Sequence, residues 1–379
     1  MTEDGALSGP VPQQRELERR RTKEVIEAFD MASVTEEYES PVQLTNLKDI
    51  FGTSGNIIVI EGDRAYSKQE VKDQKILNPK FWVYENIIKS ARVQKDMEAH
   101  PNAPFIDGVG PSSFEGLHFH AQRNGRKLVV VVTKEWEPPA YAKAWNDTTI
   151  IHGDEPLEQG YRRKLDQVLR SYRRTPESGI FLNQALYGAR AMAPIGNRIV
   201  SELQRLGVRP DATVWCLASG ASLYGIGRKI AEHFPPDSLT GFPGTETVVV
   251  TKHTSLDPAD LKDEQKVKAW ARENRKEYSK PDPAERSELD ELFFPLHVSA
   301  VNPYLLDLWE VTGKPGVDRV VKVDLAAFKE VQQRLRDTGH DWTNTTAMTL
   351  QPAVELARQG KNVLTMAYGS SRSLSRISS

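Results

Sequence analysis

Cysteine is almost missing from this chain, which has one such residue, Cys216, among 379. A single cysteine excludes an intramolecular disulfide and a metal site built from several thiolates. The residue lies in the apolar run T-V-W-C-L. We therefore interpret it as a buried core thiol and not as a nucleophile, and we expect no metal site.

Long apolar runs and an excess of one charge are missing too. No apolar stretch approaches the roughly 20 residues that a membrane-spanning helix needs, and the first residues lack the charged-then-apolar order of a signal peptide. Fifty basic and 52 acidic residues leave a formal net charge of -2. That balance shows no electrostatic attraction to nucleic acid or to an anionic membrane. We expect a cytoplasmic protein that acts on a small molecule, with no nucleic-acid or membrane partner.

What is present is an alternation of short apolar runs with longer helical patterns. The runs predict strands over 56–60, 127–133, 148–151, 212–217, 247–251, 319–323 and 362–366. Because they are continuous and do not alternate with polar residues, they are typical of strands covered on both faces by helices in mostly parallel sheets. Helices are predicted over 161–174, 190–206, 224–233 and 325–337. The sequence thus predicts an α/β fold.

Two segments stand outside this alternation. Residues 1–31 form a polar N-terminal arm whose second half is a charged helical pattern. Residues 252–292 are densely charged and mostly helical, without a strand. We interpret the second segment as a surface excursion.

Small residues follow one predicted strand in A-S-G-A-S-L-Y-G-I-G (218–227) and open the next helix. Such a turn lets successive backbone N–H groups converge on an anion, and Ser219 and Ser222 add hydroxyl donors. The turn is therefore a candidate phosphate site. The alternative is a tight connection whose small residues only permit close packing.

Two further turns carry clusters of hydroxyls. The segment D-G-V-G-P-S-S-F-E-G-L (107–117) enters a helix, and its serines are candidate anion donors, although Glu115 would repel an anion. The segment T-N-T-T-A-M-T-L-Q-P (343–352) enters another, with Pro352 predicted in the first turn. Its Thr345 and Thr346 are either N-caps or groups that face a ligand at the carboxyl edge of the sheet.

Taken in order, these segments resemble the fold-type II pyridoxal phosphate (PLP) enzymes, the group of cysteine synthase and the tryptophan synthase β-subunit. Each segment is weak alone, and their order carries the resemblance. They are 40–42 for the family's T-P-L, 57–61 for its lysine- and glutamate-bearing strand, 105–117 for E-P-T-S-G-N-T-G-I, 125–132 for the G-Y-K strand, 180–184 for the return to the large domain, 213–228 for the G-T-G-G-T loop, 343–357 for the S-S-G-A helix and 361–375 for the closing strand.

The resemblance implies two α/β domains with a ligand between them. The smaller would span 77–190, and the larger would combine 32–76 with 191–379. It also implies a homodimer.

The family's Schiff-base motif, N-P-x-G-S-x-K-D-R, matches N-P-K-F-W-V-Y-E-N (78–86) without a gap. This register puts Tyr84 where the family has its lysine. A tyrosine cannot form an imine with an aldehyde, so the covalent anchor and the usual base for the Cα proton are lost. The rival is Lys72 in E-V-K-D-Q, which would require about twelve extra residues before the next motif. Lys68, Lys75 and Lys80 are further candidates within reach.

The remaining site residues also follow from the resemblance. The phosphate would be held by Ser219, Gly220, Ala221 and Ser222, and the pyridine nitrogen would meet Thr345 or Thr346. The substrate loop would comprise Ser112, Ser113, Phe114 and Glu115, together with the retained Gln184. Because Phe114 replaces an asparagine and Glu115 adds negative charge, an amino-acid carboxylate would be poorly held there.

The implied function is an atypical cysteine synthase-like lyase or transferase that uses PLP for elimination or replacement at Cβ of an amino acid. Its catalytic centre would be rebuilt around Tyr84 or Lys72. One alternative is a repurposed enzyme that binds another phosphate-bearing or planar ligand without PLP. The other is a catalytically inactive partner or regulatory subunit of the same fold.

Overall fold

The structure, a computed structural model, describes residues 42–61, 78–134, 136, 147–153, 164, 167, 168, 171, 179–216, 220–252, 255–263, 265–267, 269–270 and 317–369. The predicted arm (1–31), Lys68, Lys72, Lys75, Ser219 and the second half of the charged excursion lie outside these residues. None of the helices that the structure describes is long and apolar enough to cross a membrane.

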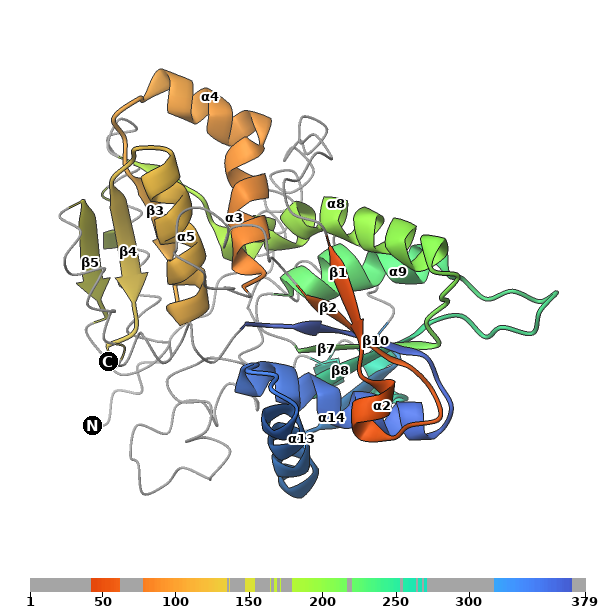
Figure 1. The fold of residues 1–379 in the computed structure, drawn as a ribbon. Helices are drawn as coiled ribbons and strands as arrows, with labels where there is room; N and C mark the ends of the chain where they lie inside the picture. The colour runs from red at the N-terminus through yellow and green to blue at the C-terminus, as the bar shows by residue number, and fades with distance from the viewer. Residues whose placement is uncertain are drawn as a thin grey trace, which may run out of the picture.

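The described strands form two sheets (Figure 1). The six-stranded sheet has the order β1 (Gln43–Asn46), β2 (Ile57–Glu61), β10 (Val363–Ala367), β7 (Ala212–Cys216), β8 (Glu246–Thr251) and β9 (Arg319–Lys322). Its edge strand β1 runs antiparallel to β2, and the other neighbours are parallel. The four-stranded sheet has the order β5 (Thr148–His152), β4 (Leu128–Val132), β3 (Phe105–Gly108) and β6 (Ile180–Phe181), all parallel.

All seven predicted strands are present, with bounds within one residue of those expected. The strands β1, β3 and β6 were not predicted. They have four, four and two residues, which is too short for a periodic pattern to appear.

Ten described helices connect and cover the sheets. They are α2 (Lys48–Phe51), α3 (Lys80–Lys89), α4 (Ala91–Ala99), α5 (Pro111–Arg123), α8 (Gln184–Arg205), η3 (Ser222–Gly227), α9 (Arg228–His233), η4 (Asp260–Lys262), α13 (Leu325–Asp337) and α14 (Asn344–Arg358). The prediction for α13 is confirmed to the residue, whereas α8 begins six residues before the predicted start at 190. Of the predicted helix 161–174, only residues 164, 167, 168 and 171 are described, and they are helical.

The prediction that Pro352 lies in a first turn was wrong. It is the ninth residue of α14, which begins at Asn344, and its N-cap is Thr343. A proline removes one backbone donor and presses on the carbonyl one turn back. Buried residues surround it on this helix, including Leu350, Ala353 and Val354, so packing against the sheet stabilises a helix that propensity alone would end.

Successive residues of the large sheet point to opposite faces, and each face has its own cover. In β2, Ile58 and Ile60 belong to one apolar cluster with residues of α8. Ile57 and Val59 belong to another with residues of α13 and α14. Figure 1 shows α8 and α9 above this sheet and α13 and α14 below it.

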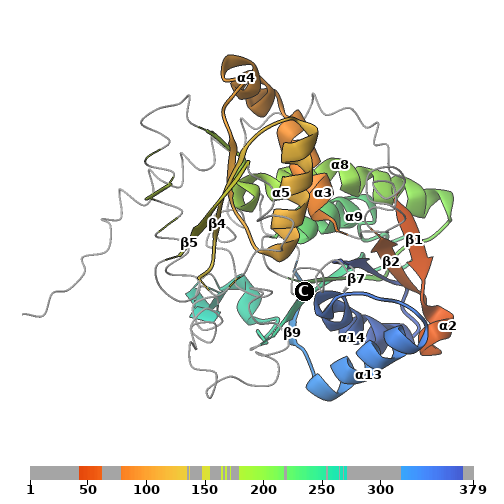
Figure 2. The ribbon, with the colours of Figure 1, turned by 60° about the vertical axis from the view of Figure 1, so that its left-hand side comes forward.

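The cluster above the large sheet also reaches the small sheet. It contains Phe105 and Val130 of the small sheet, residues of α3 and α5, and Trp215 and Leu364 of the large sheet. Figure 2 shows α3 and α5 standing between the two sheets. One continuous core therefore sets the positions of both sheets relative to α3.

Helix α8 packs on η3 through glycines. A Cβ added at Gly225 would lie 2.4 Å from Cβ of Met192 and 2.7 Å from the carbonyl oxygen of Ala189. A Cβ at Gly196 would lie 2.7 Å from the carbonyl oxygen of Gly225. The alternative reading of the 218–227 segment, close packing, is thus correct for its second half.

We expect Gly225→Ala to destabilise the protein by about 2–3 kcal/mol, because the added methyl overlaps the backbone of α8. Urea unfolding followed by circular dichroism measures this. The matched control is Gly110→Ala, since a Cβ there meets no atom within 4 Å and its φ of -100° suits any residue. Equal losses for the two variants would contradict the packing argument.

Candidate active site

Helix α3 presents the two residues at the centre of the site. The side chain of Asn78 accepts a hydrogen bond from the backbone N–H of Lys80 at 2.9 Å, which closes the Asn-Pro turn and starts the helix. Tyr84 is the fifth helical residue and is fully buried. The predicted Asn-Pro turn and helix are therefore present.

The phenol of Tyr84 meets a buried carboxyl at the end of β3. Its hydroxyl donates to Oδ2 of Asp107 at 3.2 Å, and the backbone N–H of Gln184 donates to the same oxygen at 3.0 Å. The backbone N–H of Gly108 donates to Oδ1 at 2.8 Å. Since Gln184 opens α8, the carboxyl lies at a helix N-terminus, where negative charge is stabilised.

The amine of Lys80 reaches the same place. Its Nζ donates to Oε1 of Gln184 at 2.6 Å, and Nε2 of Gln184 donates to Oγ of Ser113 at 3.1 Å. Lys80 and Tyr84 are four residues apart, so they share one face of α3. We call Lys80, Tyr84, Asp107, Ser113 and Gln184 the polar cluster.

Burial changes the protonation of both charged members. It raises the pKa of Asp107 to about 7, although the donors around the carboxyl and the charge of Lys80 lower it. It lowers the pKa of Lys80 to about 8, against the opposing effect of Asp107. The two pKa values lie close together near neutral pH, so a proton can pass between such groups at little cost.

The backbone entering α8 is strained. Asn183 has a φ of 51°, and among the described residues it is the one non-glycine residue with a positive φ. Such conformations cost about 1 kcal/mol or more and cluster at functional sites. Here the strained residue directly precedes Gln184, whose N–H and side chain both serve the cluster.

The other residues of the predicted substrate loop have two different environments: Ser112 and Glu115 form hydrogen bonds with Asn78, and Phe114 packs in the core. Nδ2 of Asn78 donates to the carbonyl oxygen of Ser112 at 2.8 Å and to Oε2 of Glu115 at 2.9 Å. Burial raises the pKa of Glu115 to about 7, against the lowering effect of this hydrogen bond. Phe114 instead points into the core, with its ring centroid 5.4 Å from that of Trp136.

The predicted phosphate turn ends in the π-helix η3, which continues into α9. Gly220 has a φ of 74°, a left-handed conformation that suits glycine, and Ala221 is the N-cap of η3. Short π-helical segments are often found at functional sites. Ser222 places its hydroxyl 3.6 Å from Sδ of Met366.

Tyr368 connects this turn with the start of α14. Its backbone N–H donates to Oγ1 of Thr346 at 2.9 Å, and its phenol oxygen accepts from the backbone N–H of Cys216 at 3.2 Å. Burial raises the pKa of this phenol, and its interaction with the Ser222 hydroxyl opposes that shift. Groups from β7, η3 and the residue after β10 thus meet at the carboxyl edge of the large sheet.

Thr346 is fully buried, with Oγ1 3.3 Å from Oγ1 of Thr343. Thr345 is only partly buried. Since the N-cap of α14 is Thr343, both predicted threonines lie in the first turn and neither is the cap. Of the two threonines, Thr346 forms the hydrogen bond with Tyr368, the residue that follows β10.

Gly188 lies between the predicted phosphate turn and helix α3, which carries part of the polar cluster. A Cβ at Gly188 of α8 would lie 3.2 Å from Cβ of Ala221 and 3.8 Å from Cγ1 of Val83. Val83 directly precedes Tyr84 on α3. The phosphate turn therefore lies beside the helix that carries Lys80 and Tyr84.

The structure brings Tyr84, Ser113 and Gln184 into one cluster, as the sequence predicted. It adds Lys80, which was a minor candidate, and Asp107, Asn78 and Tyr368, which sequence reasoning missed. The four-residue spacing of Lys80 and Tyr84 was a usable signal. Lys72 and Ser219 lie outside the described residues.

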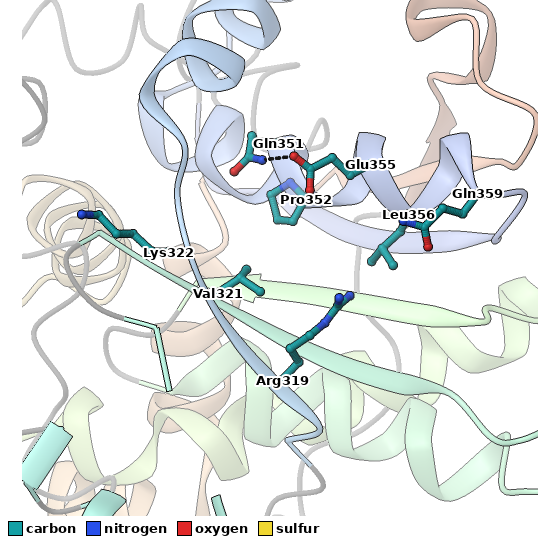
Figure 3. A pocket seen from close by; sticks show the side chains of 8 residues that line it. All are labelled: Arg319, Val321, Lys322, Gln351, Pro352, Glu355, Leu356 and Gln359. Carbon is teal, nitrogen blue, oxygen red and sulfur yellow. Dashed lines mark hydrogen bonds between the residues drawn. The ribbon is translucent and has the colours of Figure 1, made fainter. Parts of the chain in front are cut away.

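A separate pocket of about 60 Å³ lies between the edge strand β9 and α14. Figure 3 shows Arg319 on the strand side and a hydrogen bond of 2.6 Å between Gln351 and Glu355 on the helix side. None of the predicted site residues lines it.

The two mostly parallel sheets, with polar groups at their carboxyl edges and α3 between them, have the two-domain α/β architecture of the fold-type II group. The chain is similar to O-ureido-L-serine synthase, with a TM-score of 0.57 and 13% identity over 92% of this chain and 93% of that one. It is also similar to a hydrogen sulfide-producing enzyme from Fusobacterium nucleatum, with a TM-score of 0.59 and 12% identity over 88% of this chain and 97% of that one. No protein-family model and no curated protein sequence matches the chain. The predicted fold class is confirmed.

We expect stability to depend on Glu115 between pH 6 and 8. Its pKa in the folded protein is about 7, above the model-peptide value of about 4.3. The carboxyl is therefore more easily charged in the unfolded chain, and stability falls as pH rises through 7. In Glu115→Gln this fall should be smaller, because the amide oxygen still accepts from Asn78.

Urea midpoints at pH 6 and 8 measure the effect, with Glu98→Gln as the control because Glu98 is exposed on α4. The same pH slope in wild type and Glu115→Gln would show that this carboxyl is charged in both states.

Proposed function

We propose that this protein is an enzyme that binds PLP between its two sheets and catalyses elimination or replacement at Cβ of an amino acid. The observation that carries the proposal is the contact at Gly188, because it brings the candidate phosphate turn close to a helix that bears a partly buried amine. A ligand with a phosphate at one end and a carbonyl at the other matches that pair of groups.

The donor set at the turn fits a phosphate. The N–H of Cys216 and the hydroxyl of Ser222 both interact with the phenol of Tyr368, so a phosphate would take the place of this phenol as their acceptor, and Gly220 allows a close backbone approach. Among the described residues, no carboxylate takes part in these interactions. Thr346, which bonds the backbone of Tyr368, would offer its hydroxyl to the pyridine nitrogen.

At the polar cluster, this chain's residues would handle the substrate. When bound, PLP supplies an electron sink for the bond that breaks at Cα. Lys80 holds a proton at Nζ with a pKa of about 8, so it can remove and return a proton near neutral pH. Ser113 and the amide of Gln184 present hydrogen-bonding groups that orient the substrate.

The structural neighbours support the reaction class. One is a synthase of O-ureido-L-serine, a serine substituted on its side chain, and the other produces hydrogen sulfide. The first name concerns a group attached through the side-chain oxygen of serine, and the second names a sulfur product. The test is the visible absorption spectrum of the purified protein on addition of PLP, followed by product analysis with O-substituted serines and a thiol. No spectral change and no retained PLP would favour a different phosphate-bearing ligand or a partner role.

We expect Ser222→Ala to weaken PLP binding about tenfold, which corresponds to one lost hydrogen bond to a charged group. Binding of pyridoxal, which has no phosphate, should change little. Equilibrium dialysis of both ligands measures this.

The matched control is Ser201→Ala, an exposed serine of α8. An equal loss for pyridoxal and PLP in Ser222→Ala would place the phosphate elsewhere.

A further inference from the structure

Two residues on successive turns of α3 contact the Asp107–Gln184 pair of the polar cluster. The phenol of Tyr84 donates to Oδ2 of Asp107 at 3.2 Å. The amine of Lys80 donates at 2.6 Å to the side chain of Gln184, whose backbone N–H donates to that same Oδ2 at 3.0 Å, and the charges of Lys80 and Asp107 interact. The amine of Lys80 and the hydroxyl of Tyr84 therefore lie in one polar cluster.

We propose that Lys80 supplies the covalent anchor that position 84 has lost: its Nζ forms a C=N bond with the aldehyde carbon of PLP. This inference rests on the proposed function. The lone pair of the neutral amine attacks the aldehyde carbon. Two protons of the amine and the aldehyde oxygen then leave as one water, so atoms and charge balance and no oxidant or reductant is needed.

Geometry and charge both favour this lysine. A lysine one turn before the usual position lies on the same helix face, and its long side chain spans about the 5.4 Å pitch of that turn. The amine must lose its proton before it attacks, and burial, which holds its pKa at about 8, makes that loss easier than for an exposed lysine. Asp107, with a pKa of about 7, is the neighbouring group that accepts the proton.

The other described lysine of α3 on this side of the fold does not fit. Nζ of Lys89 lies 2.6 Å from Oε1 of Glu85 in an ion pair at the far end of the helix. Tyr84 acts as a positioning residue, because its hydroxyl holds the Asp107 carboxyl beside the amine.

The experiment is borohydride reduction of the full-length protein with PLP, followed by peptide mass mapping and by dialysis to count retained PLP. In the wild type we expect the reduced adduct on Lys80. Lys80→Arg should lose the adduct and keep part of its PLP affinity, since arginine preserves the charge. Lys89→Arg on the same helix is the matched control and should keep the adduct in full, and Lys72→Arg tests the rival lysine.

A rescue tests the geometry directly. In the double variant Lys80→Arg with Tyr84→Lys, the adduct should reappear at position 84, because that side chain ends at the same carboxyl. Its reappearance would support the convergence of the two positions, and its absence in a folded, PLP-binding double variant would contradict it.

Peptide mapping and PLP retention of the wild-type protein distinguish a failure of the Lys80 proposal from a failure of the proposed function, and no variant is needed. An adduct on Lys72 would overturn the Lys80 proposal and leave PLP binding intact. PLP that is retained but not reducible onto any lysine would do the same. PLP that is neither retained nor reducible would overturn the proposed function itself.

Discussion

The carboxyl of Asp107 is the interaction on which the arrangement of the site depends. A buried carboxyl is stable only when its oxygens are hydrogen-bonded, and this one accepts from β3, from the first residue of α8 and from α3. These bonds tie together three segments that are distant in the chain. They also set the electrostatic environment of Lys80, the neighbouring cation.

Helix α8 connects the polar cluster beside the small sheet with the predicted phosphate turn beside the large sheet. Its first residue binds Asp107 at the small sheet, and its later turns interlock with η3 above the large sheet through Gly196 and Gly225. Packing this close leaves little freedom to slide. The phosphate turn and the polar cluster are therefore held at a constant separation, as a ligand that spans them requires.

The chain keeps the fold that the resemblance predicted but not the residue expected at the lysine position. The helix, the turn and both sheets stand where the resemblance predicted, yet the position matched to the lysine bears a buried tyrosine, and Lys80, one turn earlier, contacts Gln184 of the same polar cluster. Function depends on where reactive atoms lie and not on which sequence position supplies them. A one-turn shift along a helix face is a small geometric change with a large effect on a motif comparison.

The sequence by itself determined seven of the ten described strands, the Asn-Pro start of α3 and the order of the motifs, because apolar periodicity and turn chemistry are local properties. The match of Tyr84 to the lysine position also comes from the sequence alone and stays a prediction. Only the tertiary structure decided that Lys80, Asp107 and Gln184 meet, that Tyr368 joins the phosphate turn to Thr346, and that Pro352 lies inside a helix. The physical reason is that hydrogen bonding and burial between segments up to 152 residues apart set protonation and contact, and no local pattern encodes which distant group will supply them.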